Sequence, residues 1–243
     1  MVPSSKTAFF SISDISVVVR TKNQSIKNQP CIWLVHGSGG ISSNEDIWIK
    51  RAEQEGYTVI IVDSYTNRGI FKQYWDKIDE YRIDAKQRAK DQIDAYNFLC
   101  QRKSLIPFAN IENSICVGFS DGGLSVIWLQ NKCFPNFWRY SHSLYPPLKN
   151  KFSENLADDL LSSNVYIYVG DKDDWTPAKY CLEFKEKTNC NLKIFKDTYH
   201  SFSKPGINHF HSTVLNDTGN RGVNCKYSIE ATQYTMNAVF ETK

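Results

Sequence analysis

Ser120 stands between two glycines in the segment Gly118-Phe-Ser-Asp-Gly122, where an apolar run gives way to a helix-like one. A strand that turns sharply into a helix strains the backbone at its apex and leaves no room for side chains on its flanks, so both flanking positions need glycine. Such a turn would hold the serine hydroxyl at the edge of a sheet and aim the first helical N–H groups, starting with that of Asp121, at any negative oxygen formed there. A bare Gly-x-Ser-x-Gly pattern is often an ordinary loop, but this context indicates a nucleophile beside a charge-stabilising site.

A serine hydroxyl is a weak nucleophile and needs a neutral histidine as its base, itself oriented by a carboxylate. Of the five histidines, only His200 directly follows the last predicted strand. His142 falls inside a predicted strand. We interpret His209 and His211 as part of a surface loop, because no third ligand is suitably spaced to make them a metal site. The sequence therefore predicts His200 as the base and no metal.

Three carboxylates follow the apolar run at 165–169 and could orient the histidine. Asp171 lies directly against the predicted strand, and Asp174 could be a surface or helix-start carboxylate. Asp173 is the favoured candidate, with the other two left open. The chain order of serine, aspartate and histidine is the one found in α/β-hydrolases.

The segment His36-Gly-Ser-Gly-Gly40 follows another predicted central strand. No Lys-Ser or Lys-Thr follows it, which excludes a phosphate-binding P-loop, and it lacks the Gly-x-Gly-x-x-Gly spacing of dinucleotide sites. The glycines could simply let the chain turn. The remaining functional interpretation is an oxyanion-hole loop that acts through the N–H of Ser38, with His36 as a packed residue that braces it.

Apolar runs alternate with amphipathic ones along the chain. Residues 31–35 form a continuous apolar run, which is typical of a central parallel strand covered on both faces. Strands are predicted over 12–20, 31–35, 57–62, 114–119, 137–145, 165–169 and 191–195, with a hairpin turn over 21–30. Helices are predicted over 44–55, 82–102, 124–130, 177–187 and 228–241, and the polar stretch after 147 could hold a short one. This alternation predicts an α/β fold, a doubly wound, mostly parallel sheet with helices on both faces.

The chain has 243 residues, enough for one α/β domain over 1–243 with a well-buried core. The net charge is only +3, and basic and acidic residues interleave over 82–103, which argues against nucleic acid as a partner. No apolar run approaches the ~20 residues that span a bilayer. The seven cysteines are scattered, and the N-terminus lacks the pattern of a secretory signal, so we expect a reducing, cytoplasmic location.

Five segments, in family order, resemble the dienelactone hydrolase-like branch of the α/β-hydrolases, in the form with serine as nucleophile. They are His36-Gly-Ser-Gly-Gly, Val62-Asp-Ser-Tyr-Thr-Asn-Arg-Gly, Gly118-Phe-Ser-Asp-Gly-Gly, Gly170-Asp-Lys-Asp-Asp-Trp-Thr-Pro and Tyr199-His-Ser-Phe. The resemblance implies an α/β-hydrolase fold and a metal-independent enzyme without cofactor. The family pattern Gly-x-x-Asp-x-x-x-Pro falls on Asp173. Lys204 stands near the place of a family arginine that helps to hold a substrate carboxylate, but lysine lacks the bidentate fork.

These observations predict a serine hydrolase that cleaves a small ester or lactone. Ser120, Asp173 and His200 would form its triad, and the N–H groups of Ser38 and Asp121 would bind the oxyanion. Other residues at strand ends could line the substrate pocket or pack in the core: Tyr65, Arg68, Trp175 and Phe202. The alternatives are a non-catalytic binding protein with this fold, or an acyltransferase or peptidase on the same scaffold.

Overall fold

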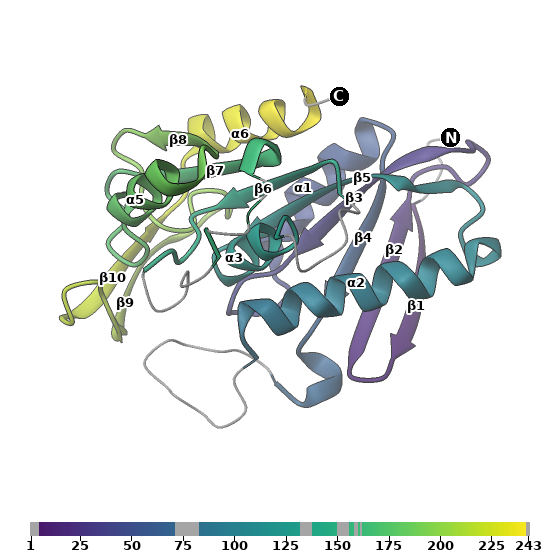
Figure 1. Cartoon of the computed structure of the whole chain (residues 1–243), viewed down its shortest axis with the longest axis horizontal. Helices are drawn as coiled ribbons and strands as arrows, with labels where there is room; N and C mark the ends of the chain where they lie inside the picture. The colour runs from purple at the N-terminus through teal and green to yellow at the C-terminus, as the bar shows by residue number, and fades with distance from the viewer. Residues whose placement is uncertain are drawn as a thin grey trace.

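The computed structural model describes residues 5–70, 83–131, 138–149, 156–157, 160 and 162–241. Their main element is an eight-stranded sheet with the order β1-β2-β4-β3-β5-β6-β7-β8 (Figure 1). Strand β2 is antiparallel to both of its neighbours, and the other pairs are parallel. The strands are β1 (Lys6–Ile12), β2 (Ile15–Thr21), β3 (Gln29–Val35), β4 (Thr58–Asp63), β5 (Ala109–Phe119), β6 (Tyr140–Leu144), β7 (Val165–Gly170) and β8 (Asn191–Phe195).

Helices cover both faces of this sheet, as Figure 1 shows for α2 and α1. Alternate residues of β3 point to opposite faces, so Trp33 packs with α2 and α3, whereas Leu34 packs with α1 and α6. Helix α5 packs against β7. The helices are α1 (Ser43–Gln54), α2 (Ala85–Gln101), α3 (Asp121–Trp128), α5 (Ala178–Thr188) and α6 (Ile229–Glu241). The predicted doubly wound, mostly parallel fold is confirmed.

The first predicted strand is wrong in extent. Residues 12–20 belong to a hairpin of β1 and β2, which turns at Ser13, a residue with φ of 48°. The segment 21–30, predicted as a hairpin turn, instead leads from β2 to β3, which are separated in the sheet by β4. Strand β1 was missed because most of its side chains are exposed, so it carries little of the alternating apolar pattern that marks a half-buried strand.

A second, two-stranded sheet contains β9 (Asn208–Leu215) and β10 (Arg221–Lys226). The interpretation of His209 and His211 as loop residues is therefore wrong, because both lie on β9. Seven of the eight residues of β9 are exposed or half-buried, so the strand has no apolar face that a sequence pattern could reveal. Within the described ranges, no cluster of three or more His, Cys, Asp or Glu side chains is arranged to hold a metal ion.

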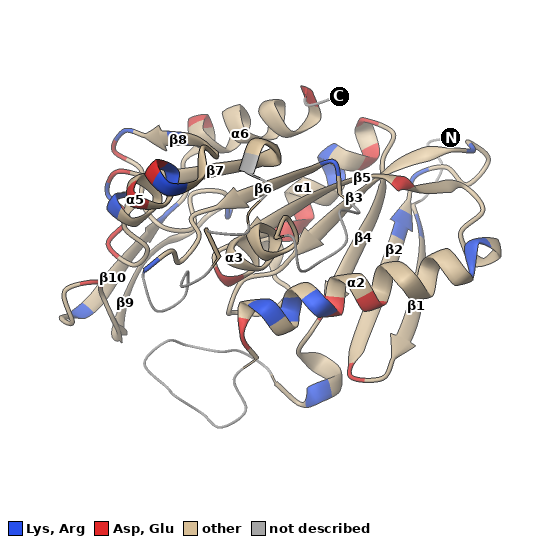
Figure 2. Cartoon of the chain, in the orientation of Figure 1, with Lys and Arg blue, Asp and Glu red and all other residues tan. Residues whose placement is uncertain are grey.

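The other predicted elements agree with the structure to within a few residues. Positions 82 and 137, and most of the polar stretch after 147, lie outside the described residues. Figure 2 shows that basic and acidic residues both occur along α2, as predicted, and Lys90 pairs there with Asp94 at 2.7 Å. None of the described helices is long and apolar enough to cross a membrane.

Candidate active site

Ser120 occupies the turn between β5 and α3 with an unusual backbone, φ 53° and ψ −117°. A Cβ atom on Gly118 would lie 2.1 Å from the carbonyl oxygen of Gly122, and one on Gly122 would lie 2.1 Å from that of Val35. The Ser120 N–H donates to the carbonyl of Leu144 at 2.9 Å, which ties the turn to β6. The glycines are thus required by the close approach of three backbone segments.

Replacing Gly122 by alanine is expected to lower the free energy of unfolding by more than about 3 kcal/mol, because the obstacle is backbone rather than a movable side chain. Thermal unfolding of the purified variant measures this. Gly39→Ala is the matched control, since a Cβ atom there meets nothing within 4 Å. Equal melting temperatures for the two variants would contradict the close-approach argument.

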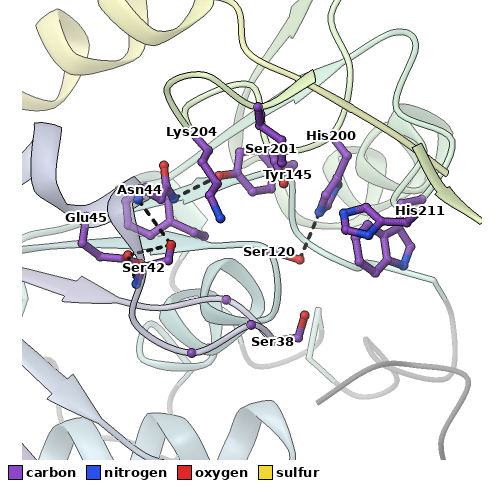
Figure 3. Close-up of a pocket in the computed structure, with 16 residues that line it drawn as sticks. Ser38, Ser42, Asn44, Glu45, Ser120, Tyr145, His200, Ser201, Lys204 and His211 are labelled. Carbon is purple, nitrogen blue, oxygen red and sulfur yellow. Dashed lines mark hydrogen bonds between the residues drawn. The ribbon is translucent and has the colours of Figure 1, made fainter. Parts of the chain in front are cut away.

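His200 reaches the serine from the loop after β8. Its Nε2 lies 3.2 Å from the Ser120 hydroxyl oxygen (Figure 3), and its Nδ1 lies 2.8 Å from Oδ2 of Asp173. The ring is buried, with 1% of its surface exposed, between the rings of Tyr145 and Trp175, each centred 4.8 Å away. If Nδ1–H donates to the carboxylate, Nε2 is left as an acceptor for the serine proton.

Asp173 is fixed by its own turn. Its Oδ1 accepts hydrogen bonds from the backbone N–H groups of Trp175 at 3.0 Å and Thr176 at 2.7 Å, and its Oδ2 accepts one from the Thr176 hydroxyl at 2.9 Å. The two alternative carboxylates point elsewhere. Asp171 is exposed beside the N–H of Thr198, and Asp174 binds Asn224. Among the three, the structure brings only Asp173 to the histidine.

The glycine loop after β3 lies against the serine turn. A Cβ atom on Gly37 would lie 3.1 Å from the carbonyl oxygen of Phe119 and 3.5 Å from Cβ of Ser120. Ser38 lines the same cavity as Ser120 and His200, and Asp121 is the first residue of α3, directly after the serine. The two N–H groups predicted to bind an oxyanion therefore belong to the two segments that meet at the serine hydroxyl.

Ser120 and His200 open into a cavity of about 240 Å³, shown in Figure 3. This volume is below the ~300–1,000 Å³ typical of sites for drug-sized ligands. The described residues that line it are Gly37, Ser38, Gly39, Gly40, Ser42, Asn44, Glu45, Phe119, Ser120, Tyr145, Trp175, His200, Ser201, Lys204, Ile207 and His211. Seven of these sixteen residues come from the loop after β3 and the first residues of α1.

Charged side chains stand at the end of the cavity formed by α1. The side chain of Lys204 points into it, and its ammonium forms no hydrogen bond or ion pair with any described residue (Figure 3). Burial raises the pKa of Glu45 to about 7, against the opposing effect of hydrogen bonds from Ser42. Because this carboxyl is partly protonated near neutral pH, it cannot fully neutralise the ammonium of Lys204.

Three of the residues predicted by position as possible pocket residues do not line the cavity. Arg68 turns away to form a bidentate pair with Asp91, at 2.8 and 2.9 Å. Tyr65 is buried with its ring 4.5 Å from that of His36, and Phe202 is buried in the core. The sequence predicted which strand ends these three residues follow. It could not predict where their side chains point, because that depends on partners distant in the sequence. Trp175 and Lys204 do line the cavity.

Tyr145, which sequence reasoning did not select, links three parts of the site. Its hydroxyl lies 2.7 Å from that of Ser203, which donates to Oδ1 of Asn44 at 3.0 Å, and Nδ2 of Asn44 donates back to Tyr145 at 3.3 Å. Its backbone lies at φ 42°, a conformation uncommon for a bulky residue. Its place directly after β6, before two prolines, was the only available signal.

The sheet order, the serine turn at the end of β5 and the histidine after β8 define an α/β-hydrolase. A model of the dienelactone hydrolase family matches residues 15–241, and the chain therefore belongs to this family of hydrolases. Among the curated proteins, no significant match is found.

Solved structures with low sequence identity share the fold. A protein of Klebsiella pneumoniae subsp. pneumoniae assigned as a dienelactone hydrolase is 15% identical, with 99% of this chain and 100% of that one covered and a TM-score of 0.73. An α/β-hydrolase from a Medee basin deep-sea metagenome library is 15% identical, with coverage of 98% and 99% and a TM-score of 0.65. Esterase 2 of Thermogutta terrifontis, phosphoramylated by tabun, is 12% identical, with coverage of 98% and 93% and a TM-score of 0.64.

Proposed function

We propose that the protein is a serine hydrolase that cleaves a small ester or lactone through an acyl-enzyme on Ser120. The observation that carries the proposal is the buried relay in which His200 contacts Ser120 at 3.2 Å and Asp173 at 2.8 Å. Membership of a hydrolase family supports the reaction class. The small cavity supports a substrate of modest size.

In the proposed reaction, Nε2 of His200 takes the proton of Ser120 as the serine oxygen attacks the carbonyl carbon. The N–H groups of Ser38 and Asp121 stabilise the resulting oxyanion. Collapse of this intermediate breaks the bond to the alcohol oxygen, which takes the proton from His200. Water, deprotonated by the same histidine, then attacks the acyl-enzyme and releases the acid. With a lactone, the alcohol and the acid remain parts of one product.

The test is labelling with a fluorophosphonate probe, followed by location of the adduct by mass spectrometry. An organophosphate, tabun, modifies the similar Thermogutta esterase, which supports the choice of reagent. The expected result is a single adduct on Ser120 together with turnover of short-acyl p-nitrophenyl esters or small lactones. A folded protein that neither reacts nor turns over any ester would be a binding protein. Faster cleavage of peptides, or preferred transfer to an added acceptor, would favour the peptidase or acyltransferase.

We further propose that Lys204 binds an anionic group of the substrate, because its ammonium faces the cavity without a partner among the described residues. Lys204→Met should raise the KM for an ester bearing a carboxylate by ~10-fold, about 1.4 kcal/mol, and leave the KM of a neutral ester of the same length unchanged. Steady-state kinetics with the two esters measures this.

Lys50→Met is the matched control, because it removes an exposed lysine of α1 that does not line the cavity. The proposal for Lys204 fails if Lys204→Met raises the KM of the neutral ester by the same factor, or if Lys50→Met has the same effect on the anionic one.

A further inference from the structure

Arg88 is a buried charge that the proposed reaction does not use. It lies on α2 with 1% of its surface exposed and forms no ion pair with any described carboxylate. Two of its nitrogens, Nε and Nη1, are buried and have no hydrogen-bond partner in the part of the chain that the structure describes. Removing a charge from water costs several kcal/mol unless it is paired, so stability alone gives no reason to place an arginine here.

The third nitrogen of the guanidinium, Nη2, contacts His36. This nitrogen donates a hydrogen bond to the backbone carbonyl of His36 and lies 3.2 Å from Nδ1 of the same residue. The guanidinium stacks over the ring of Tyr65 at 5.1 Å, and that ring contacts the imidazole edge-on at 4.5 Å. Arg88 and Tyr65 thus enclose the histidine at the point where β3 ends and the glycine loop begins.

Two groups contact the carbonyl of the peptide bond that joins Gly37 to Ser38: the ring of His36, and the N–H of Gly40, which donates to it at 3.1 Å. The Nδ1 of His36 lies 2.8 Å from the Gly37 carbonyl oxygen, which can only accept, so the proton is assigned to Nδ1; Nη2 of Arg88, which can only donate, therefore binds His36 through its backbone carbonyl and not through Nδ1. The Nε2 of His36 accepts from the N–H of Ser64 at 3.4 Å. A peptide group is planar and trans, so fixing the Gly37 carbonyl fixes the opposite direction of the Ser38 N–H.

We propose that Arg88 is a positioning residue of the oxyanion site: by holding His36, it fixes the Gly37–Ser38 peptide with its N–H toward the nucleophile. The inference rests on the proposed function, because Ser38 N–H has this role only in acyl transfer. A fixed donor stabilises charge that develops in the transition state without reorganising, so the contribution of Arg88 belongs to kcat rather than to KM.

The burial of His36 and the charges around it explain why its ring stays neutral. Burial, and then the charge of Arg88, lower the pKa of His36 to about 3, so the ring is neutral over the whole working range. Asp63 from β4, 3.9 Å from Nε2, and Asp91 from α2 act in the opposite direction. Without Arg88 the pKa of His36 should rise, and protonation of Nε2 would oppose the N–H of Ser64 and displace the loop at acidic pH.

Arg88→Met, which removes the charge at similar length, tests the proposal. Hydrolysis of a neutral ester should lose ~10–100-fold in kcat with KM unchanged, less than the ~10²–10³ that follows loss of a whole oxyanion donor. Its melting temperature should not fall, because an unpaired buried charge is replaced by an apolar side chain. Arg88→Lys, which keeps the charge without the planar fork, should recover part of the kcat.

Gln92→Leu is the matched control, one helical turn along α2. It also removes a buried side chain whose polar atoms lack hydrogen-bond partners among the described residues, but Gln92 forms no hydrogen bond with the glycine loop, so the kcat of Gln92→Leu should equal that of the wild type. If Arg88→Met turns over like wild type, or if Gln92→Leu loses as much kcat, Arg88 has no specific positioning role.

A second readout does not depend on activity. In the wild type, ¹⁵N NMR of the ring of His36 should show the neutral form protonated at Nδ1 from pH 5 to pH 8, and Arg88→Met should raise the pKa of this ring. Unchanged His36 signals in Arg88→Met would overturn the inference. If the wild type cleaves no ester but Arg88→Met still changes the His36 signals, the proposed function is wrong. The interaction between Arg88 and His36 is then still supported.

Discussion

Ser120→Ala is expected to abolish fluorophosphonate labelling and to reduce ester turnover by about 10⁶-fold, the scale on which loss of a triad serine is felt. The hydroxyl is the atom that His200 contacts at 3.2 Å, and no described side chain replaces it at the turn. The adduct mass and the steady-state rate of the two proteins measure the effect. Labelling that persists at another residue of the alanine variant would show that the nucleophile lies elsewhere.

The same position allows a test of strain. Because Ser120 has φ of 53°, glycine can occupy the turn with less strain than alanine. Ser120→Gly should therefore be as inactive as Ser120→Ala but more stable by about 1–2 kcal/mol, which corresponds to a melting temperature roughly 2–8 °C higher for a chain of this size. Equal stability of the two inactive variants would mean that the turn stores no strain energy.

Asp173→Asn should lower kcat by about 10³–10⁴-fold with the fold intact. Oδ1 already accepts two backbone hydrogen bonds, from Trp175 and Thr176, so asparagine will keep its oxygen there and turn its amide toward His200. The amide donates, which forces Nδ1 to accept and places the ring proton on Nε2. That nitrogen can then no longer take the proton of Ser120.

Two neighbouring carboxylates supply the controls for this prediction. Asp171→Asn and Asp174→Asn each change one carboxylate of the same loop, but neither of these side chains contacts the histidine. Both should retain wild-type kcat. A loss of 10³-fold or more in Asp174→Asn, with Asp173→Asn active, would reassign the triad acid.

The sheet was predictable because its central strands are covered on both faces. The run at 31–35 is continuously apolar since Trp33 and Leu34 are buried on opposite sides. The same reasoning fails for β1 and β9, whose side chains mostly face solvent and therefore carry no pattern. Edge and ribbon strands are specified by backbone pairing, which a sequence pattern records poorly.

The active site also has one part that could be predicted from the sequence and one part that could not. The order of Ser120, Asp173 and His200 along the chain could be read because each follows a recognisable strand. The residues that line the cavity could not be predicted, because the direction of each side chain depends on partners distant in the sequence. Arg68 was expected near the pocket, but it pairs with Asp91, 23 residues away. Conversely, the sequence did not predict Glu45 as a site residue, because it looks like an ordinary residue of a predicted helix. In the structure it is both a capping residue of α1 and part of the cavity wall.

The hydrogen-bonded ring of Tyr145, Ser203 and Asn44 has a consequence for how the site opens. It ties the end of β6, the loop after His200 and the start of α1 into one closed circuit. Fraying of any one segment breaks bonds in the other two, so the three should unfold locally as a single cooperative unit. Their amide protons should therefore exchange with solvent at similar rates, and the cavity should be either fully formed or absent in any one molecule.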